Sequence, residues 1–280
     1  MDTESERDRM RIKSRASFVS ALTFVLILTL TLTSYTTAEP AADHTDVPWI
    51  GERLVFEISW FNLKGGTAVI EASEGAEVNG RKVHQISAVT NSNQIVDKFH
   101  KVRDRVDSFI YADNLSSFRF KVHQEEGRFR QDKEIYFDYT KGTAAYTVGK
   151  ETSHYPIPFF VQDALSSLYY LRTRELVIGN PVIIDVFDDK KLWQVEVQVL
   201  GKERIVTPAG EFDTVMVKPL LKFEGIFQRK GEVYVWLTDD SRRMPVRMKS
   251  RIKIGSVFAD LVEYKNSSQG PAYHPFNSPP

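Results

Sequence analysis

Basic side chains recur at every second position near the C-terminal end of the sequence, a spacing that could bind anions. Arg247, Lys249, Arg251 and Lys253 would project from one face of a strand, and Arg243 comes shortly before them. Such a row could contact lipid head groups, lipopolysaccharide phosphates or acidic glycans. It could equally be a solvated sheet face whose charges discourage aggregation. We favour the solvated face and keep Arg243, Arg247, Lys249 and Arg251 as candidate anion contacts.

The residue types that bind metals or attack substrates form no local motif. The 6 histidines include no pair at i, i+2 or i, i+4 spacing, and the chain has no cysteine. No Gly-x-Ser-x-Gly motif and no phosphate-binding glycine loop is present. The carboxylate pairs Asp188/Asp189 and Asp239/Asp240 fall in polar turns, where neighbours seldom face each other across a cleft. We therefore expect no metal, no cofactor and no catalytic residue.

Seven aromatic side chains could line a ligand cleft or fill the core of the protein. Large aromatic residues dominate β-rich cores, so the core is the favoured interpretation. They are Trp60, Phe159, Phe160, Tyr169, Tyr170, Trp193 and Trp236.

Composition narrows the class of protein. The chain has 280 residues, of which 42% are hydrophobic and 26% charged, close to the average of globular proteins. Lys and Arg total 37 and so do Asp and Glu. A nucleic-acid-binding protein usually carries a basic excess, so we expect no nucleic-acid partner.

The N-terminal segment has the layout of a secretory signal. Basic residues up to Arg15 precede an apolar run over residues 16–32, and small residues follow at Thr36 and Ala38. We expect a signal peptide or signal anchor over residues 1–38 that engages the membrane at least transiently. Cleavage is favoured over anchoring through residues 16–32. In either case the folded part is expected outside the cytoplasm, in the periplasm or associated with the envelope.

Alternation of apolar and polar residues dominates the chain after a polar linker at residues 39–46. Leu54, Phe56, Ile58 and Trp60 share one face of a strand over residues 53–60. Gly65-Gly66 and Asn79-Gly80 are expected to be turns, the latter a hairpin turn. The whole pattern predicts a dozen or more short antiparallel strands in one domain over residues 47–264. The tail over residues 265–280 is rich in Ser, Gly and Pro and is expected to be disordered.

One segment follows a helical period. Leu165, Leu168 and Tyr169 recur at helical spacing within residues 162–172, and Asp163 can cap the start of the helix. Gly179 and Pro181 end the segment. We expect one central helix that packs on the sheet.

Several segments together resemble a bacterial family of exported proteins, the domain of unknown function 3108. The resemblance rests on residues 51–60, 66–68, 163–172, 207–214 and 235–246 and extends over residues 47–264. It implies a periplasmic or outer-membrane-associated protein with a long, curved antiparallel sheet of the spiral β-roll type. It supplies no catalytic residues.

Three functions remain open from the sequence. We favour a non-catalytic envelope protein that binds a lipid, an anionic glycan or an envelope partner protein. The first alternative is a hydrolase of envelope glycans or lipids, which would need two carboxylates converging in a cleft. The second is a structural or assembly protein that acts through exposed sheet edges.

Overall fold

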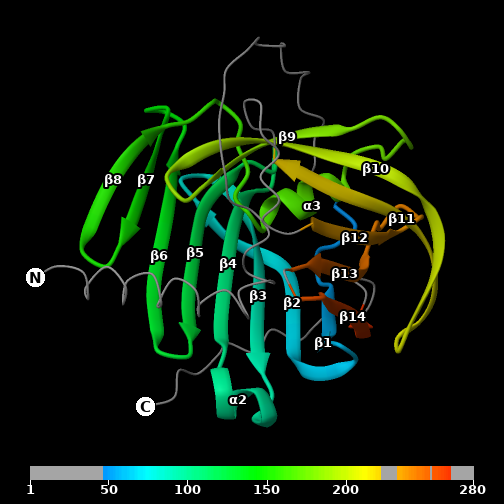
Figure 1. The fold of residues 1–280 in the computed structure, drawn as a ribbon. Helices are drawn as coiled ribbons and strands as arrows, with labels where there is room; N and C mark the ends of the chain where they lie inside the picture. The colour runs from blue at the N-terminus through cyan, green and yellow to red at the C-terminus, as the bar shows by residue number, and fades with distance from the viewer. Residues whose placement is uncertain (1–46, 222–231, 253, 266–280) are drawn as a thin grey trace, which may run out of the picture.

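The protein is built on one antiparallel sheet of 14 strands, which the computed structural model describes for residues 47–221, 232–252 and 254–265. The strand order is β8-β7-β6-β5-β4-β3-β2-β1-β14-β13-β12-β11-β10-β9. Strands that follow each other in sequence pair in the sheet, except β8 and β9, which form its two edges, and β14 pairs with β1 to join the two halves (Figure 1).

Two short helices accompany the strands, and the bounds of all elements follow. The first half contains β1 (Arg53–Trp60), β2 (Leu63–Val78), β3 (Arg81–Ser92), α2 (Gln94–His100), β4 (Arg103–Tyr111), β5 (Ser117–Glu126), β6 (Phe129–Asp138), β7 (Thr143–Val148) and β8 (Glu151–Pro156). The second half contains α3 (Ser166–Arg172), β9 (Val182–Asp188), β10 (Lys191–Thr207), β11 (Gly210–Leu221), β12 (Glu232–Thr238), β13 (Pro245–Arg251) and β14 (Ser256–Lys265).

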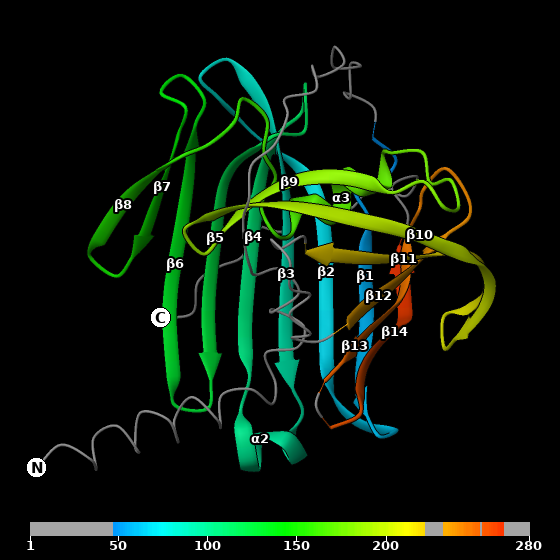
Figure 2. The same ribbon diagram turned by 45° about the horizontal axis from the view of Figure 1, so that its top comes forward.

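The sheet curls until its β9 edge contacts β6 and the other edge strand, β8, through side chains, as in the ring contact of Tyr155 with Phe187. Lys133 Nζ of β6 lies 2.6 Å from Asp188 Oδ1 of β9. The rings of Phe137 and Phe187 pack edge to face across the same gap. Figures 1 and 2 show β9 and β10 crossing over the ends of β4 to β6, with α3 between the two halves. The result is a strongly curved sheet that is not closed into a barrel.

The predicted fold class is confirmed: the protein is mainly β, antiparallel and curved, with a central helix. A second helix, α2, was not predicted. Asn93 Oδ1 accepts hydrogen bonds from the backbone N–H of Ile95 and Val96, which caps its start. The helix has only 7 residues, none of them buried, and its apolar residues Ile95, Val96 and Phe99 span too short a segment to stand out as a helical period.

The expected turn at Gly65-Gly66 is wrong. The chain reverses at Phe61 and Asn62, which both have positive φ, while both glycines lie inside β2. A Cβ added at Gly66 would lie 2.2 Å from the carbonyl oxygen of Asn91 on β3. Glycine is therefore required there by the close approach of a neighbouring strand.

Several predicted segments lie outside the described residues. They are the signal segment 1–38, the linker 39–46, Lys253 and the tail beyond Lys265. Within the described part of the chain, no helix has the length and apolar character needed to cross a membrane.

Candidate functional site

A cavity of about 440 Å³ lies between the two halves of the curled sheet. Inward-facing aliphatic side chains form both walls, contributed by β2 to β5 on one side and by β9 to β14 on the other. A volume of this size is typical of small-molecule sites. The wall residues that the argument below uses are Ala88, Val106, Val122, Val197, Val217 and Val235.

The alternating pattern of the sequence creates the apolar walls. In β10, Trp193, Val195, Val197 and Val199 are buried, whereas the residues between them are more exposed. Valine side chains are short and stiff, so they cover a wall without filling the space in front of it. Ala88 on β3 is only half-buried, because the cavity lies beyond its methyl group.

Helix α3 closes one end of the cavity with Leu165, Leu168 and Leu171 from its face and the preceding turn. Asp163 holds this segment in place, because its carboxylate accepts hydrogen bonds from the backbone N–H of Leu165 and Ser166. It also accepts hydrogen bonds from the hydroxyl groups of Ser108 and Ser117. These hydrogen bonds close the turn before the helix. The helix itself begins later than expected, at Ser166, and its N-cap position is Leu165, whose side chain makes no capping hydrogen bond.

A buried ion pair fixes the other side of α3. The guanidinium of Arg172 donates two hydrogen bonds to the Glu52 carboxylate, with Nη2 2.8 Å from Oε2. Tyr169 donates a third hydrogen bond to Glu52, and Arg172 also donates to the backbone oxygen of Arg242. Burial alone would lower the pKa of Arg172, but the hydrogen bonds to Glu52 raise it above its usual value. Arg172 thereby joins α3 to the start of β1 and to the β12–β13 turn.

The opposite end of the cavity, beside α2, is polar. Gln124, Glu126, Gln131 and His100 line it, together with Asp104. Glu126 and Asp104 are buried and hydrogen-bonded to each other. Burial and the neighbouring Asp104 carboxylate raise the pKa of Glu126 to about 7. Glu126 therefore keeps its proton over the acidic range.

We expect stability to fall as pH rises through the titration of Glu126. Its folded pKa of about 7 lies above the ordinary 4.5, so the folded state holds the proton more tightly than the unfolded state. The free energy of unfolding should therefore decrease between pH 4.5 and 7 by up to about 3 kcal/mol. Glu126→Gln keeps a neutral side chain and should flatten this dependence. Urea denaturation at pH 5 and pH 8 measures it, and an equal slope in both proteins would contradict the assignment.

The carboxylate pair does not have the geometry of a glycoside hydrolase. Glycoside hydrolysis needs two carboxyl groups about 5 Å or more apart, so that a sugar fits between them. Asp104 and Glu126 instead contact each other directly. Asp188/Asp189 lie at the end of β9, where Lys133 already pairs with Asp188, and Asp239 pairs with Lys202 on the outside.

Most of the predicted basic row lies on the outer face of the sheet. Met248 and Ser250 line the cavity, and Arg247 and Arg251, which alternate with them, face away from it. Lys249 also touches the cavity. Arg247 forms an ion pair with Asp260 and Arg251 with Glu232, while Lys249 lies over the ring of Phe258. Arg243 donates a hydrogen bond to the backbone oxygen of Arg172. Anion binding by these residues stays a prediction.

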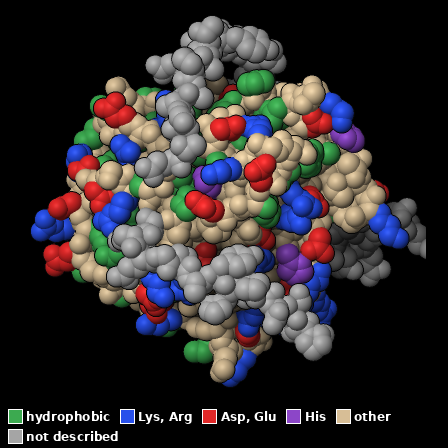
Figure 3. Space-filling model, turned by 180° about the vertical axis from the view of Figure 1, so that it is seen from behind, with side chains coloured by type: hydrophobic (Ala, Val, Ile, Leu, Met, Phe, Trp, Pro, Cys, Tyr) green, Lys and Arg blue, Asp and Glu red, His purple; other side chains and the backbone are tan. Residues whose placement is uncertain are grey.

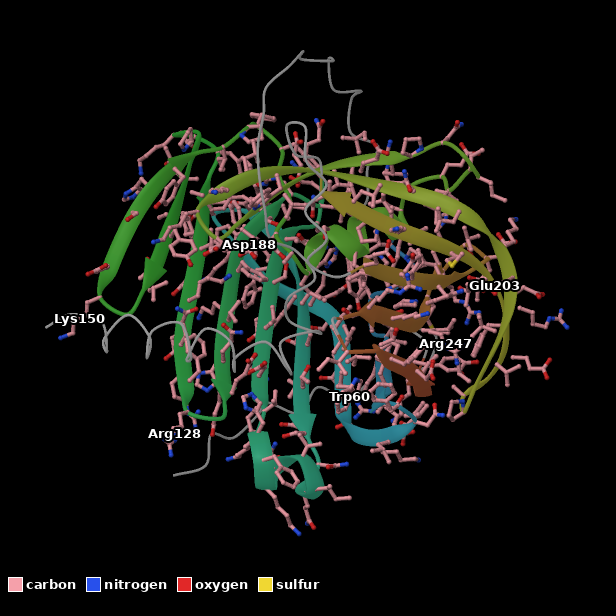
Figure 4. All side chains as sticks on the ribbon, viewed as in Figure 1. Trp60, Arg128, Lys150, Asp188, Glu203 and Arg247 are labelled. Atoms are coloured by element: carbon pink, nitrogen blue, oxygen red, sulfur yellow. The ribbon has the colours of Figure 1, made fainter. Side chains whose placement is uncertain are left out.

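The surroundings of this row are mixed in charge. The end of the β10–β11 hairpin folds over β12 to β14, where Trp236 donates a hydrogen bond to Glu203 and Arg247 donates to the backbone oxygen of Val206. Figure 4 shows Glu203 and Arg247 on this side of the molecule. Seen from behind, blue and red side chains are interspersed over the surface (Figure 3).

None of the seven candidate aromatic residues lines the cavity in the described part of the chain. Tyr169, Trp193 and Trp236 are buried in the core, whereas Phe159 is exposed. Sequence analysis missed Glu126, although the signal was present. Phe120 and Val122 alternate on the inner face of β5, and extending that period by two steps places Glu126 inside.

The family model described as protein of unknown function (DUF3108) matches residues 55–262. The chain belongs to the DUF3108 family. The match spans β1 to β14, so the whole curled sheet with its cavity is the DUF3108 domain.

A solved structure shares the fold of this DUF3108 protein. The β-barrel-like DUF1849 protein from Brucella abortus is 11% identical, with a TM-score of 0.54, and covers 79% of this chain and 99% of its own. At this identity the likeness shows the fold alone. An exported protein, by its description, with a YmcC-like fold from Bacteroides fragilis has 10% identity, TM-score 0.33 and coverage of 80% and 100%. A Parabacteroides distasonis protein described as a lipoprotein has 12% identity, TM-score 0.35 and coverage of 80% and 99%. No curated protein matches the sequence.

Proposed function

We propose that this DUF3108 protein is exported to the cell envelope and binds the hydrocarbon chain of a lipid in its cavity, without catalysis. The observation that carries the proposal is the cavity of about 440 Å³ with aliphatic walls. Each methylene group moved from water into such a site contributes about 0.8 kcal/mol. An acyl chain of modest length would therefore offset the cost of binding.

The chemistry of the walls favours a lipid over a glycan. A glycan presents many hydroxyl groups, each of which needs a hydrogen-bond partner when it is buried. The walls offer mainly Val, Ala, Ile and Leu side chains, and the polar groups gather at the α2 end and at the Lys133–Asp188 ion pair, whose charges already neutralise each other. A ligand with one long apolar part and one polar end matches this distribution.

Export is proposed from the sequence of residues 1–38, with its basic start, apolar run and small residues near Ala38. An envelope location gives the protein access to lipids. Engagement of the membrane by this segment belongs to the same proposal.

A fluorescent fatty acid whose emission rises in apolar surroundings tests the proposal. We expect saturable binding with one site per chain, and displacement by unlabelled fatty acid but not by a soluble glycan fragment. Emission that stays at the level of the probe in buffer, at protein concentrations up to the solubility limit of the probe, would refute lipid binding.

A further inference from the structure

Four connections gather at one end of the sheet and expose large apolar side chains there. Because neighbouring strands are antiparallel, the β1–β2 turn, α2, the β5–β6 turn and the β13–β14 turn all lie at the same end. The exposed fractions include 86% for Phe99, 70% for Leu63 and 67% for Ile95. Six such residues lie here: Phe61, Leu63, Ile95, Phe99, Phe129 and Ile254. We call residues 61–64, 94–101, 127–130 and 254–255 the rim.

The rim is a fixed part of the fold. Asn93 joins α2 to the start of β2, with its side-chain Nδ2 2.6 Å from the Lys64 oxygen and its backbone N 2.8 Å from the Gly65 oxygen. Trp60 Nε1 donates a hydrogen bond of 2.8 Å to the Ile254 oxygen, which ties the β1–β2 and β13–β14 turns together. The Gly127 amide donates to the Lys101 oxygen, which ties α2 to the β5–β6 turn. The apolar side chains are therefore held outward together.

These side chains have no role in the core. α2 buries none of its residues, so Ile95 and Phe99 contribute little to folding. Exposed apolar residues that cluster on one surface usually mark an interaction site. The question is which partner they fit.

The charge of the rim identifies the partner. Its sequence contains five Lys and Arg residues (Lys64, Lys98, Lys101, Arg128 and Arg130) but one acidic residue, Asp97. Three of the basic side chains pair with carboxylates at its border, Lys64 with Glu57, and Lys101 and Arg130 with Glu125. Lys98 and Arg128 are exposed and have no carboxylate partner among the residues that the structure describes. Figure 4 shows Arg128 at this end of the sheet, with Trp60. Basic side chains around apolar tips complement a surface that has anionic head groups over hydrocarbon.

We propose that the rim docks on the surface of a lipid bilayer that contains anionic lipids. Phe61, Leu63, Ile95 and Phe99 enter the boundary between head groups and acyl chains, and Lys98 and Arg128 contact the phosphates. The cavity reaches this end, since Phe129 is part of both the rim and the cavity wall. This goes beyond the proposed function, because a cavity could also be filled from solution.

Single cysteine variants of the full chain test the docking. The chain has no cysteine, so Phe99→Cys can be labelled at one position with the environment-sensitive fluorophore NBD. Phe159→Cys is the matched control, because Phe159 is 84% exposed and follows β8, away from the rim. With vesicles of phosphatidylglycerol and phosphatidylcholine, we expect the emission of the label at 99 to shift to the blue and that at 159 to stay unchanged. Both labels are on the full chain. Attachment through residues 1–38 alone would bring both labels to the vesicle equally, so a blue shift confined to position 99 reports insertion of the rim.

Reversal of the charge at two rim positions is the second test of docking. Lys98→Glu with Arg128→Glu, in the labelled Phe99→Cys chain, should weaken the response to anionic vesicles at least tenfold. The response to pure phosphatidylcholine should change little. Equal shifts at positions 99 and 159, or no shift at 99, would overturn the proposal and leave a protein partner as the alternative occupant of the rim. Fatty-acid binding without vesicles is read separately, so failure of docking and failure of the cavity are distinguishable.

Discussion

Arg172→Leu is expected to lower the free energy of unfolding by about 3–5 kcal/mol. The substitution removes the ion-pair partner of Glu52, whose side chain is only 5% exposed and would be left buried without it. It also leaves the Arg242 oxygen without its hydrogen bonds from Nε and Nη2. Because these contacts fix α3 to the start of β1 and to the β12–β13 turn, the end of the cavity should loosen as well.

Chemical denaturation monitored by tryptophan fluorescence measures this effect. Arg204→Leu is the matched control, because Arg204 forms an ion pair with Asp213 whose side chains are 64% and 70% exposed. An exposed pair contributes at most about 1 kcal/mol. A loss for Arg172→Leu no larger than that for Arg204→Leu would contradict the importance of the buried pair.

Ala88→Trp is expected to abolish most of the uptake of a fatty acid. The half-buried methyl group of Ala88 faces the cavity, so an indole ring at this position would occupy space that an acyl chain needs. If the ring displaces about three methylene groups from the site, the affinity should fall about fiftyfold. Titration with the fluorescent fatty acid gives the ratio of dissociation constants.

Ala145→Trp controls for the introduction of a large aromatic residue into a strand. Ala145 is half-buried on β7, between the buried residues Ala144 and Tyr146, and therefore faces outward. The affinity of the Ala145→Trp variant for the fatty acid should match that of the unmodified chain. Similar affinities for Ala88→Trp and the unmodified chain would place the lipid elsewhere.

The sequence predicted strands well where one face is buried and the other is not. The alternation over residues 53–60 placed β1 with its observed bounds, and Asn79-Gly80 forms the predicted hairpin turn, with positive φ at both residues. Local periodicity therefore carried most of the fold. The prediction of a turn at Gly66 was wrong, because glycine is required there by the close approach of Asn91 on another strand.

The candidate site was less accessible to sequence reasoning. The cavity depends on how far the sheet curls, and contacts between residues distant in sequence, such as Lys133 with Asp188, set that curl. The basic row at Arg247, Lys249 and Arg251 was visible, but the direction in which it faces depends on which side of β13 the curl encloses. Ile95 and Phe99 carried no signal, since exposed apolar residues have meaning only once the turns that surround them are known.

The most direct test of lipid binding is native mass spectrometry of the protein purified without detergent from the envelope fraction of the producing cell. We predict that part of the population carries an added mass equal to one lipid, and that Ala88→Trp loses this adduct while Ala145→Trp keeps it. A mass equal to the protein alone, unchanged after incubation with fatty acid or phospholipid, would contradict the account.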